Sequence, residues 1–401
     1  MNIKKNVVLV LTLVVAIVAM SGCTTFNNFK DTFFAKKGTE ADTIKIGVLE
    51  PETGTDSRKG QLEIDGIKMA HSLVGEVLGK KVELVYADTQ SSIYVAETVV
   101  QDLITKKPAI VLGSCGEAVT MVAGKYLGEA KIPAITITAE NPLITKNNPY
   151  YFRVCFNEAS QAKAISEYVS EKLLSDTAAV VRMKNDDAVA PLVSQFTDTF
   201  TKKTKDANSI STRLTIDPNE KDYAAYVKLL ASTETRAVFM PISLKYAEKF
   251  FAEVSKQNYF QPTFIGPKEW HSDELIKLQE KFPGIRIAVA SDFNINMEDN
   301  IRVAEETAYY DMFVKAYESK YGKMEPEEET AQAFDAYMLA IEAIEQAQST
   351  DSELITEALK ATKGFAGASG NISFDESGES MKTINIDVIR DGKFVSIYTI
   401  N

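Results

Sequence analysis

Short apolar runs alternate along the chain with longer segments in which apolar residues recur at helical spacing. The first strands expected from this pattern are Ile44–Leu49, Val82–Tyr86, Ala109–Leu112 and Ala134–Thr138, and the helices between them are Leu62–Val77, Val95–Thr105 and Ala118–Ala130. Runs such as Ala109–Leu112 are apolar throughout, which is typical of strands covered by helices on both faces. The order therefore predicts an α/β fold with a parallel sheet.

The same alternation restarts near Ala178 and predicts a second α/β lobe. Its expected strands are Ala178–Met183, Ser211–Ile216, Ala237–Met240, Thr263–Ile265 and Ile285–Val289, with helices such as Leu192–Lys203 and Tyr246–Gln257 between them. Three helices, Val303–Tyr321, Ala331–Ala347 and Ser352–Ala361, and a group of strands, Asn371–Phe374, Ile384–Arg390 and Phe394–Ile400, are expected to follow. Asp391-Gly392 predicts a tight hairpin turn between the last two strands.

The N-terminus has the pattern of an export signal. Two lysines, Lys4 and Lys5, precede the apolar run Val7–Met20, which ends at Ser21-Gly22-Cys23. As a helix at ~1.5 Å per residue the run would cover only ~21 Å of a ~30 Å hydrocarbon core. Its resemblance to the bacterial lipobox implies that residues 1–22 are removed and that Cys23 carries the lipid anchor. An uncleaved anchor helix is the alternative, and both place the rest of the chain outside the cytoplasmic membrane.

Composition suits a two-lobed extracytoplasmic protein. The polar segment 23–42 is expected to be a flexible tether, and 401 residues are more than one hydrophobic core usually organises. The formal net charge of −12, with acids and bases interspersed, speaks against a nucleic-acid partner. Besides Cys23 there are only Cys115 and Cys155, without a CxxC motif or ligand-spaced histidines, so no metal is expected. Whether these two cysteines form a disulfide or are two small buried residues stays open.

Several motifs in order resemble the branched-chain amino acid (Leu/Ile/Val) binding proteins of ABC importers. They are Lys45–Leu49 with Thr53-Gly54 and Gly60, Gly113–Thr120, Lys131-Ile132-Pro133, Glu140-Asn141-Pro142, Tyr151–Val154, Phe264-Ile265-Gly266-Pro267, Phe334–Tyr337, Ala343-Ile344-Glu345 and Asn371–Gly378. Each motif is weak alone, but together they span nearly all of 43–401. The resemblance implies the periplasmic binding protein type I fold, in which two Rossmann-like lobes are joined by three chain crossings.

The resemblance also implies a ligand in the cleft between the lobes, which agrees with ligand binding at the carboxyl ends of parallel strands. The crossings are expected near Asn157, Asp292 and Ile372. Lobe 1 would then comprise 43–157 plus 292–371, and lobe 2 would comprise 158–291 plus 372–401. Members of this family are extracytoplasmic, deliver a small molecule to ABC permease subunits and need no cofactor, so we expect the same here, with a monomeric body held to the membrane through Cys23.

The family's ligand contacts are changed in this chain. Where relatives seat the α-carboxylate of an amino acid on serine and threonine, this chain has Glu117 and Glu140. The acid that holds the ligand ammonium after the Gly-Pro of the second lobe aligns with Lys268, next to Glu269 and Trp270. The aromatic residue that covers the ligand aligns with Arg58 or Lys59, so Trp270 is expected to supply an apolar wall instead.

Three accounts of these changes stay open. Glu117 and Glu140 could cap a helix and a turn while the ligand sits beyond them. They could attract a cationic group while Lys268 or Arg58 meets an anionic one. The alignment could also be displaced slightly. The remaining candidate ligand residues have hydroxyl or carboxylate side chains at strand ends and are Ser114, Thr120 and Thr138 in the first lobe and Asp187 and Ser243 in the second.

The sequence thus predicts a solute-binding lipoprotein of an ABC importer. Its ligand would be a small polar molecule, either an amino acid or a related amide, amine or organic acid. A sensing or assembly lipoprotein with the same fold is the alternative. An enzyme is not expected, because the chain has no GxSxG or Walker A motif and because His71 and His271 lack companions at ligand spacing.

Overall fold

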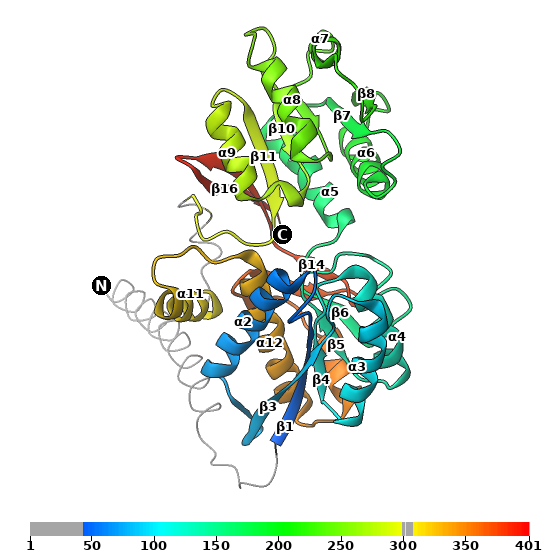
Figure 1. The fold of residues 1–401 in the computed structure, drawn as a ribbon, viewed down its shortest axis with the longest axis vertical. Helices are drawn as coiled ribbons and strands as arrows, with labels where there is room; N and C mark the ends of the chain where they lie inside the picture. The colour runs from blue at the N-terminus through cyan, green and yellow to red at the C-terminus, as the bar shows by residue number, and fades with distance from the viewer. Residues whose placement is uncertain (1–42, 299–300, 302–307, 401) are drawn as a thin grey trace, which may run out of the picture.

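The computed structural model describes residues 43–298, 301 and 308–400. The expected signal segment 1–22, the tether 23–42 and the lipidation site Cys23 lie outside these residues. The described part forms two α/β lobes that stand one above the other in Figure 1, and the predicted fold class is confirmed. Within that part, none of the helices combines the length and apolar character that a membrane crossing requires.

The sheet of the first lobe has the strand order β2-β3-β1-β4-β5-β6. Its strands are β1 (Thr43–Glu50), β2 (Glu76–Val77), β3 (Lys80–Asp88), β4 (Ile110–Leu112), β5 (Ala134–Thr136) and β6 (Tyr151–Arg153). Neighbours pair in parallel, apart from the antiparallel pair β2 and β3. The buried cores on its two faces are built from α2 (Ser57–Leu73), α11 (Ala308–Tyr321), α12 (Glu328–Ala347) and α13 (Ser352–Lys360) on one side and α3 (Ile93–Thr105) and α4 (Glu117–Glu129) on the other.

The sheet of the second lobe has the order β16-β15-β11-β10-β9-β7-β8. Its strands are β7 (Ala178–Met183), β8 (Ile210–Ile216), β9 (Ala237–Phe239), β10 (Thr263–Gly266), β11 (Arg286–Ser291), β15 (Ile384–Arg390) and β16 (Lys393–Ile400). The flanking helices are α5 (Glu158–Glu167) with the π-helical η1 (Tyr168–Lys172) and α6 (Ala190–Thr204) on one face, and α7 (Tyr223–Ser232), α8 (Leu244–Val254) and α9 (Asp273–Lys281) on the other. The predicted hairpin turn is present, since Asp391 and Gly392 have φ of 51° and 74° between β15 and β16.

A small antiparallel sheet of β12 (Phe365–Gly367), β13 (Gly370–Phe374) and β14 (Ser380–Lys382) lies beside the first lobe. Ile372 and Phe374 from β13 pack in the core of that lobe. We therefore propose that the lobes divide near Asn157 and Asp292, as expected from the sequence, but that the third crossing lies at Thr383, between β14 and β15, rather than near Ile372.

Some predicted element boundaries move. The helix expected over Leu62–Val77 is α2, which begins at Ser57 and ends at Leu73. Beyond it, Glu76 and Val77 pair with β3 as an antiparallel strand, so the apolar Val77 is buried by sheet pairing instead of on a helix face. The helix expected over Val303–Tyr321 is described from Ala308 onward as α11, and its expected first residues fall outside the described part.

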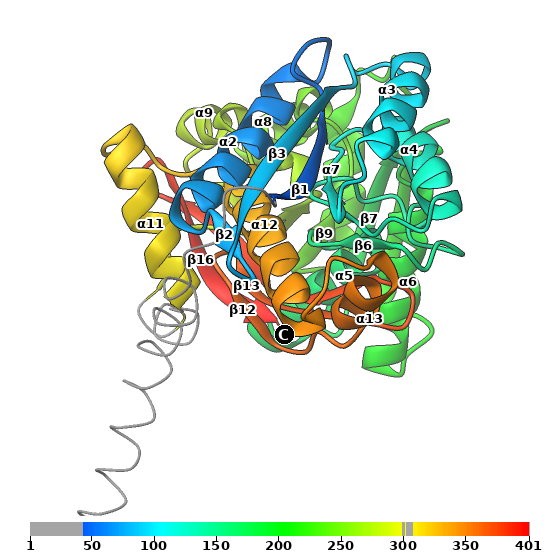
Figure 2. The ribbon, with the colours of Figure 1, turned by 90° about the horizontal axis from the view of Figure 1, so that it is seen from below.

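Helices α2 and α12 pack closely over the first sheet, side by side in Figure 2. A Cβ on Gly66 would lie 2.2 Å from the Thr330 carbonyl oxygen, which is backbone and cannot rotate away. Gly66→Ala should therefore push the helices apart and lower the free energy of unfolding by about 1–3 kcal/mol, measured by urea denaturation. Gly284→Ala is the matched control, because nothing lies within 4 Å of its Cβ position. An unchanged Gly66→Ala protein would show that this contact does not limit packing.

Candidate ligand cleft

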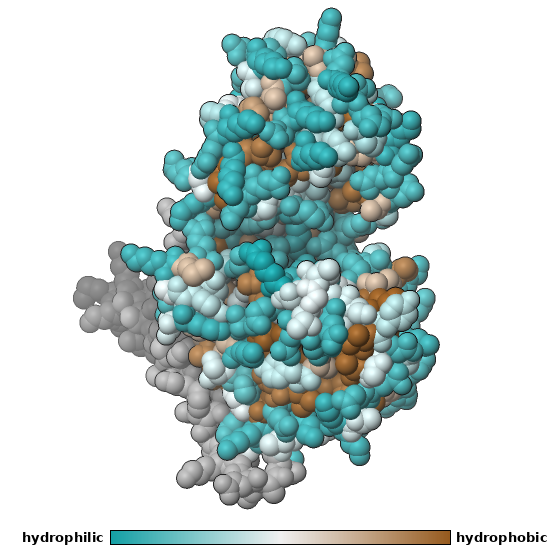
Figure 3. All heavy atoms as spheres, viewed as in Figure 1, coloured by the Kyte–Doolittle hydropathy of each residue, from teal (hydrophilic) through white to brown (hydrophobic). Residues whose placement is uncertain are grey.

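The surface where the two lobes face each other is mainly hydrophilic, as the band across the middle of Figure 3 shows. The loops that follow the strand ends of both sheets supply charged side chains here. The central one is Lys268, in the single-turn helix η2 (Lys268–Trp270) that follows β10. The electrostatics of the cleft are organised around this residue.

The Lys268 ammonium is surrounded by carboxylates of this chain. Its Nζ lies 3.1 Å from Glu140 Oε1 and 3.3 Å from Glu328 Oε1, and it also pairs with Asp292. The ring of Phe156 lies 4.8 Å from the same nitrogen. Burial alone would lower the pKa of Lys268, but Asp292, Glu328 and Glu140 together raise it well above its ordinary value. The expectation that Lys268 would meet an anionic ligand group is therefore not supported, since the protein itself neutralises it.

The carboxylates around Lys268 have different electrostatic environments. Asp292 is fully buried, and burial would raise its pKa, but Lys268 and Lys382 outweigh burial and lower it. Its Oδ1 also accepts the Phe156 N–H at 3.1 Å. Burial raises the pKa of Glu140 to about 7 against the opposing effect of Lys268. Asp292 thus stays ionised, whereas Glu140 can exchange a proton near neutral pH.

Glu117 begins α4 and organises the neighbouring loop. Its Oε1 accepts the backbone N–H of Glu140 at 2.7 Å, and its Oε2 accepts that of Asn141 at 2.8 Å. This geometry supports the account in which Glu117 has a structural role. Glu117 is nevertheless exposed. The pKa of Glu158, at the start of α5, is raised by burial and then by the charges of Glu117 and Glu269. Carboxylates from both lobes therefore repel one another across the cleft.

The hydroxyl candidates of the first lobe are buried and engaged in bonds within it. Thr120 donates to the carbonyl oxygens of Ser114 and Gly116 at 2.8 Å and 2.7 Å. Thr138 donates to Glu63, and the Ser114 hydroxyl lies 3.5 Å from Glu50 Oε2. These side chains shape the floor of the cleft rather than its open surface.

The expected apolar wall at Trp270 is not present. The indole is 1% exposed, donates its N–H to the Ile242 carbonyl oxygen at 2.6 Å and packs edge-on against Phe251. The ring occupies the space above Gly266, where a Cβ would lie 2.1 Å from it. Trp270 therefore belongs to the core of the second lobe, although it immediately follows the cleft residues Lys268 and Glu269 in sequence.

The remaining candidates lie farther out. Asp187 and Ser243 are exposed in loops that follow β7 and β9. Arg58 pairs with Glu327 at 2.9 Å with its side chain 83% exposed. It borders a groove of about 630 Å³ that is also lined by His271 and Glu325. Lys59 is half-buried. Burial alone would lower its pKa, but the charges of Glu63, Glu329 and Glu140 raise it. Lys59 therefore lies near the central cluster, whereas Arg58 faces outward.

Three residues of the cleft were missed as ligand-site candidates from the sequence, namely Glu158, Asp292 and Glu328. The sequence predicts Asp292 only as a chain crossing, whereas the structure buries it beside Lys268. Glu328 is the first residue of α12, in an acid-rich stretch that looks like an ordinary helix start. The cysteines left open by the sequence are both buried and free.

Comparisons with known proteins agree with this architecture. The family model described as periplasmic binding protein matches residues 43–386. The leucine-, isoleucine-, valine-, threonine- and alanine-binding protein of Pseudomonas aeruginosa is 25% identical over 367 residues, which cover 86% of this chain and 89% of the relative. The crystal structure of the leucine-binding protein LivK from Thermotoga maritima is 27% identical with a TM-score of 0.68, covering 89% of this chain and 99% of that one. The substrate-binding protein LivJ from Streptococcus pneumoniae, in complex with isoleucine, is 26% identical with a TM-score of 0.68, covering 90% and 99%.

Proposed function

Since the chain belongs to the periplasmic binding protein family, we propose that it is the extracytoplasmic solute-binding lipoprotein of an ABC importer. The family and the fold support binding of a small molecule between the lobes by hinge closure. The sequence pattern before Cys23 supports the lipid anchor. The partners in this proposal are the ligand, ABC permease subunits and the membrane, and the protein acts as a monomer without enzymatic activity.

The charge balance of the cleft carries the proposal for the ligand. Lys268 is neutralised by Asp292, Glu140 and Glu328, and so is not available to an anion. Burial, and after it the charges of Glu117 from the first lobe and Glu269 from the second, raise the pKa of Glu158. Closure brings such like charges closer, which costs on the order of 1–4 kcal/mol for a pair at about 4 Å. A ligand with an amine group removes that cost, so we propose an amine or an amino acid bound through its ammonium.

Isothermal titration of the full chain against amino acids, amides, polyamines and organic acids tests this proposal. We expect amine-bearing compounds to bind and organic acids without an amine to fail. Glu158→Gln should raise the Kd of the amine about tenfold or more, because a hydrogen bond to a charged group contributes about 1.5–3 kcal/mol. Glu248→Gln in the same lobe is the control, since Glu248 forms a surface pair with Lys281 on α9. Strong binding of an anionic compound without an amine would contradict the proposed ligand class.

A further inference from the structure

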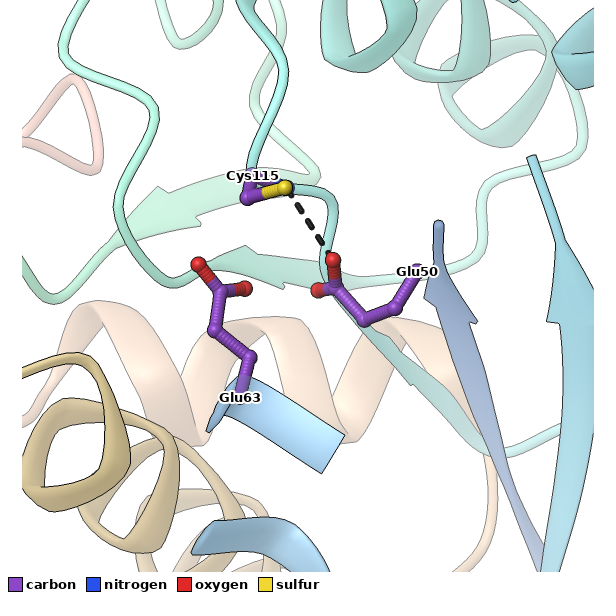
Figure 4. A group of neighbouring side chains, drawn as sticks. All are labelled: Glu50, Glu63 and Cys115. Atoms are coloured by element: carbon purple, nitrogen blue, oxygen red, sulfur yellow. Dashed lines mark hydrogen bonds between the residues drawn. The ribbon is translucent and has the colours of Figure 1, made fainter. Parts of the chain in front are cut away.

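Three side chains from different elements of the first lobe converge in its interior. Glu50 ends β1, Glu63 lies in α2, and Cys115 follows β4; Figure 4 shows their functional groups around one small space. One carboxylate oxygen of each glutamate and the Cys115 Sγ lie within 4.8 Å of one another. The three residues are 1%, 0% and 6% exposed, respectively. The space between them is therefore shielded from bulk water.

Each carboxylate has one oxygen that is fixed by a neighbour and one that is open. Glu50 Oε2 accepts the Cys115 N–H at 3.1 Å, and Glu63 Oε1 accepts the Thr138 hydroxyl. Within the described part of the chain, the other two oxygens, Glu50 Oε1 and Glu63 Oε2, are buried, and no other residue donates a hydrogen bond to them. They can bond to each other only when a proton lies between the two carboxyl groups. A buried carboxylate oxygen without a partner is unfavourable. The hydrogen bonds that the fixed oxygens accept are of the kind that usually orient the side chains that bind a metal.

The charges around the cluster fit a divalent cation. Burial, and after it the charge of Glu63 and a hydrogen bond with Glu63, raise the pKa of Glu50. Burial raises the pKa of Glu63 to about 7 against its hydrogen bond with Glu50, and the nearby Lys59 opposes both shifts. Burial followed by the two glutamates also raises the pKa of the Cys115 thiol. Two carboxylates and a thiolate would carry three negative charges, which a divalent cation and the Lys59 ammonium together balance. In the absence of a cation, protons must take its place.

We propose that Glu50, Glu63 and Cys115 bind one divalent cation of the zinc class. A thiolate with two carboxylates favours zinc or cadmium over magnesium and calcium, which prefer oxygen ligands alone. Three protein ligands leave a fourth tetrahedral position for a water molecule. The ion would tie β1, α2 and the loop before α4 together. Thr138, which donates to Glu63, connects the cluster to the buried hydroxyl residues of the first lobe.

Cadmium and zinc titrations of the full chain carrying Cys23→Ser test this site. This background leaves Cys115 and Cys155 as the only thiols. We expect one equivalent of cadmium to produce a thiolate-to-metal charge-transfer band in the ultraviolet, and zinc but not magnesium to raise the melting temperature. Lowering the pH should weaken zinc binding, because Glu50, Glu63 and Cys115 must release their protons.

Variants assign the band to the cluster. Cys115→Ser should abolish it, and Glu63→Gln should raise the zinc Kd about tenfold or more. Cys155→Ser is the matched control, because Cys155 is equally buried but outside the cluster, and should leave the band unchanged. Circular dichroism of each variant without metal verifies folding, and Glu63→Gln keeps the shape of the side chain if Cys115→Ser does not fold. No band in the parent protein, or a band that survives Cys115→Ser, would overturn the proposal and leave Glu50 and Glu63 as a proton-sharing pair.

Discussion

Replacing Lys268 by methionine should lower the free energy of unfolding by about 3–5 kcal/mol, because it removes one partner from a buried ion cluster. Asp292 has a fully buried side chain, and Glu140 and Glu328 have side chains only 22% and 14% exposed. Without the ammonium these carboxylates repel one another in a region where water cannot screen them. Urea denaturation followed by circular dichroism measures the loss.

The matched control is Lys281→Met, which removes a lysine of the same lobe from a surface pair. Lys281 Nζ lies 2.6 Å from Glu248 Oε1, but the two side chains are 60% and 37% exposed. Exposed pairs of this kind contribute about 0–1 kcal/mol, so we expect little change. Equal effects of the two substitutions would show that the cluster around Lys268 is as well solvated as the surface, contrary to the structure.

The effect of Lys268→Met should depend on pH in a defined direction. Lys268 holds the pKa of Asp292 below its ordinary value. It also opposes burial at Glu140, which raises the pKa of that carboxyl group to about 7. A lowered carboxyl pKa stabilises the folded state above the unfolded pKa, and this stabilisation is lost as pH falls through the folded value. In the variant, protons can replace the missing ammonium as pH falls. We therefore expect the difference between the two proteins to be large at pH 8 and much smaller at pH 5.

The periodicity of the sequence was sufficient for the fold because each helix and strand buries apolar residues in its own local pattern. The run Ala109–Leu112 and the turn Asp391-Gly392 are clear cases, since neither needs knowledge of distant residues. The third crossing, expected near Ile372, is the point where our proposal of Thr383 differs from the sequence-based expectation. Ile372 and Phe374 are apolar in a strand that either lobe could bury, and only the three-dimensional packing assigns them to the first.

The site was less predictable because it depends on partners that are distant in sequence. Lys268 at the place of the family's acid was recognised as unusual, but the sequence does not reveal that Asp292 and Glu328 neutralise it. Trp270 was assigned to the cleft on proximity, whereas the absence of a side chain at Gly266 creates the space that takes its ring into the core. The grouping of Glu50, Glu63 and Cys115 has no sequence motif at all, since three separate elements contribute to it.

Arg153 has the second large expected effect, although the sequence shows it only as part of the motif Tyr151–Val154 and gives no sign of its partners. Its side chain is 0% exposed, and its guanidinium contacts both oxygens of Glu379, with Nε 3.1 Å from Oε2 and Nη2 3.2 Å from Oε1. It also donates to the carbonyl oxygens of Ala139 and Asn141, on either side of Glu140. Arg153 thus joins the loop that carries Glu140 to the turn before β14.

Arg153→Met should therefore destabilise the protein by about 3–5 kcal/mol, because Glu379 loses its charged partner and two carbonyl oxygens lose a donor in a buried region. The Thr145 hydroxyl and the Asn157 amide still donate to Glu379 in this variant. Arg153→Lys should recover little of this loss, since an ammonium cannot reproduce the planar fork that contacts both oxygens. Arg390→Met is the matched control, because its pair with Glu298 is partly exposed, at 53% and 30%, and should contribute about 1 kcal/mol or less. Urea denaturation measures all three variants. A fully restored stability in Arg153→Lys would mean that the charge alone matters and that the bidentate geometry does not hold the Glu140 loop in place.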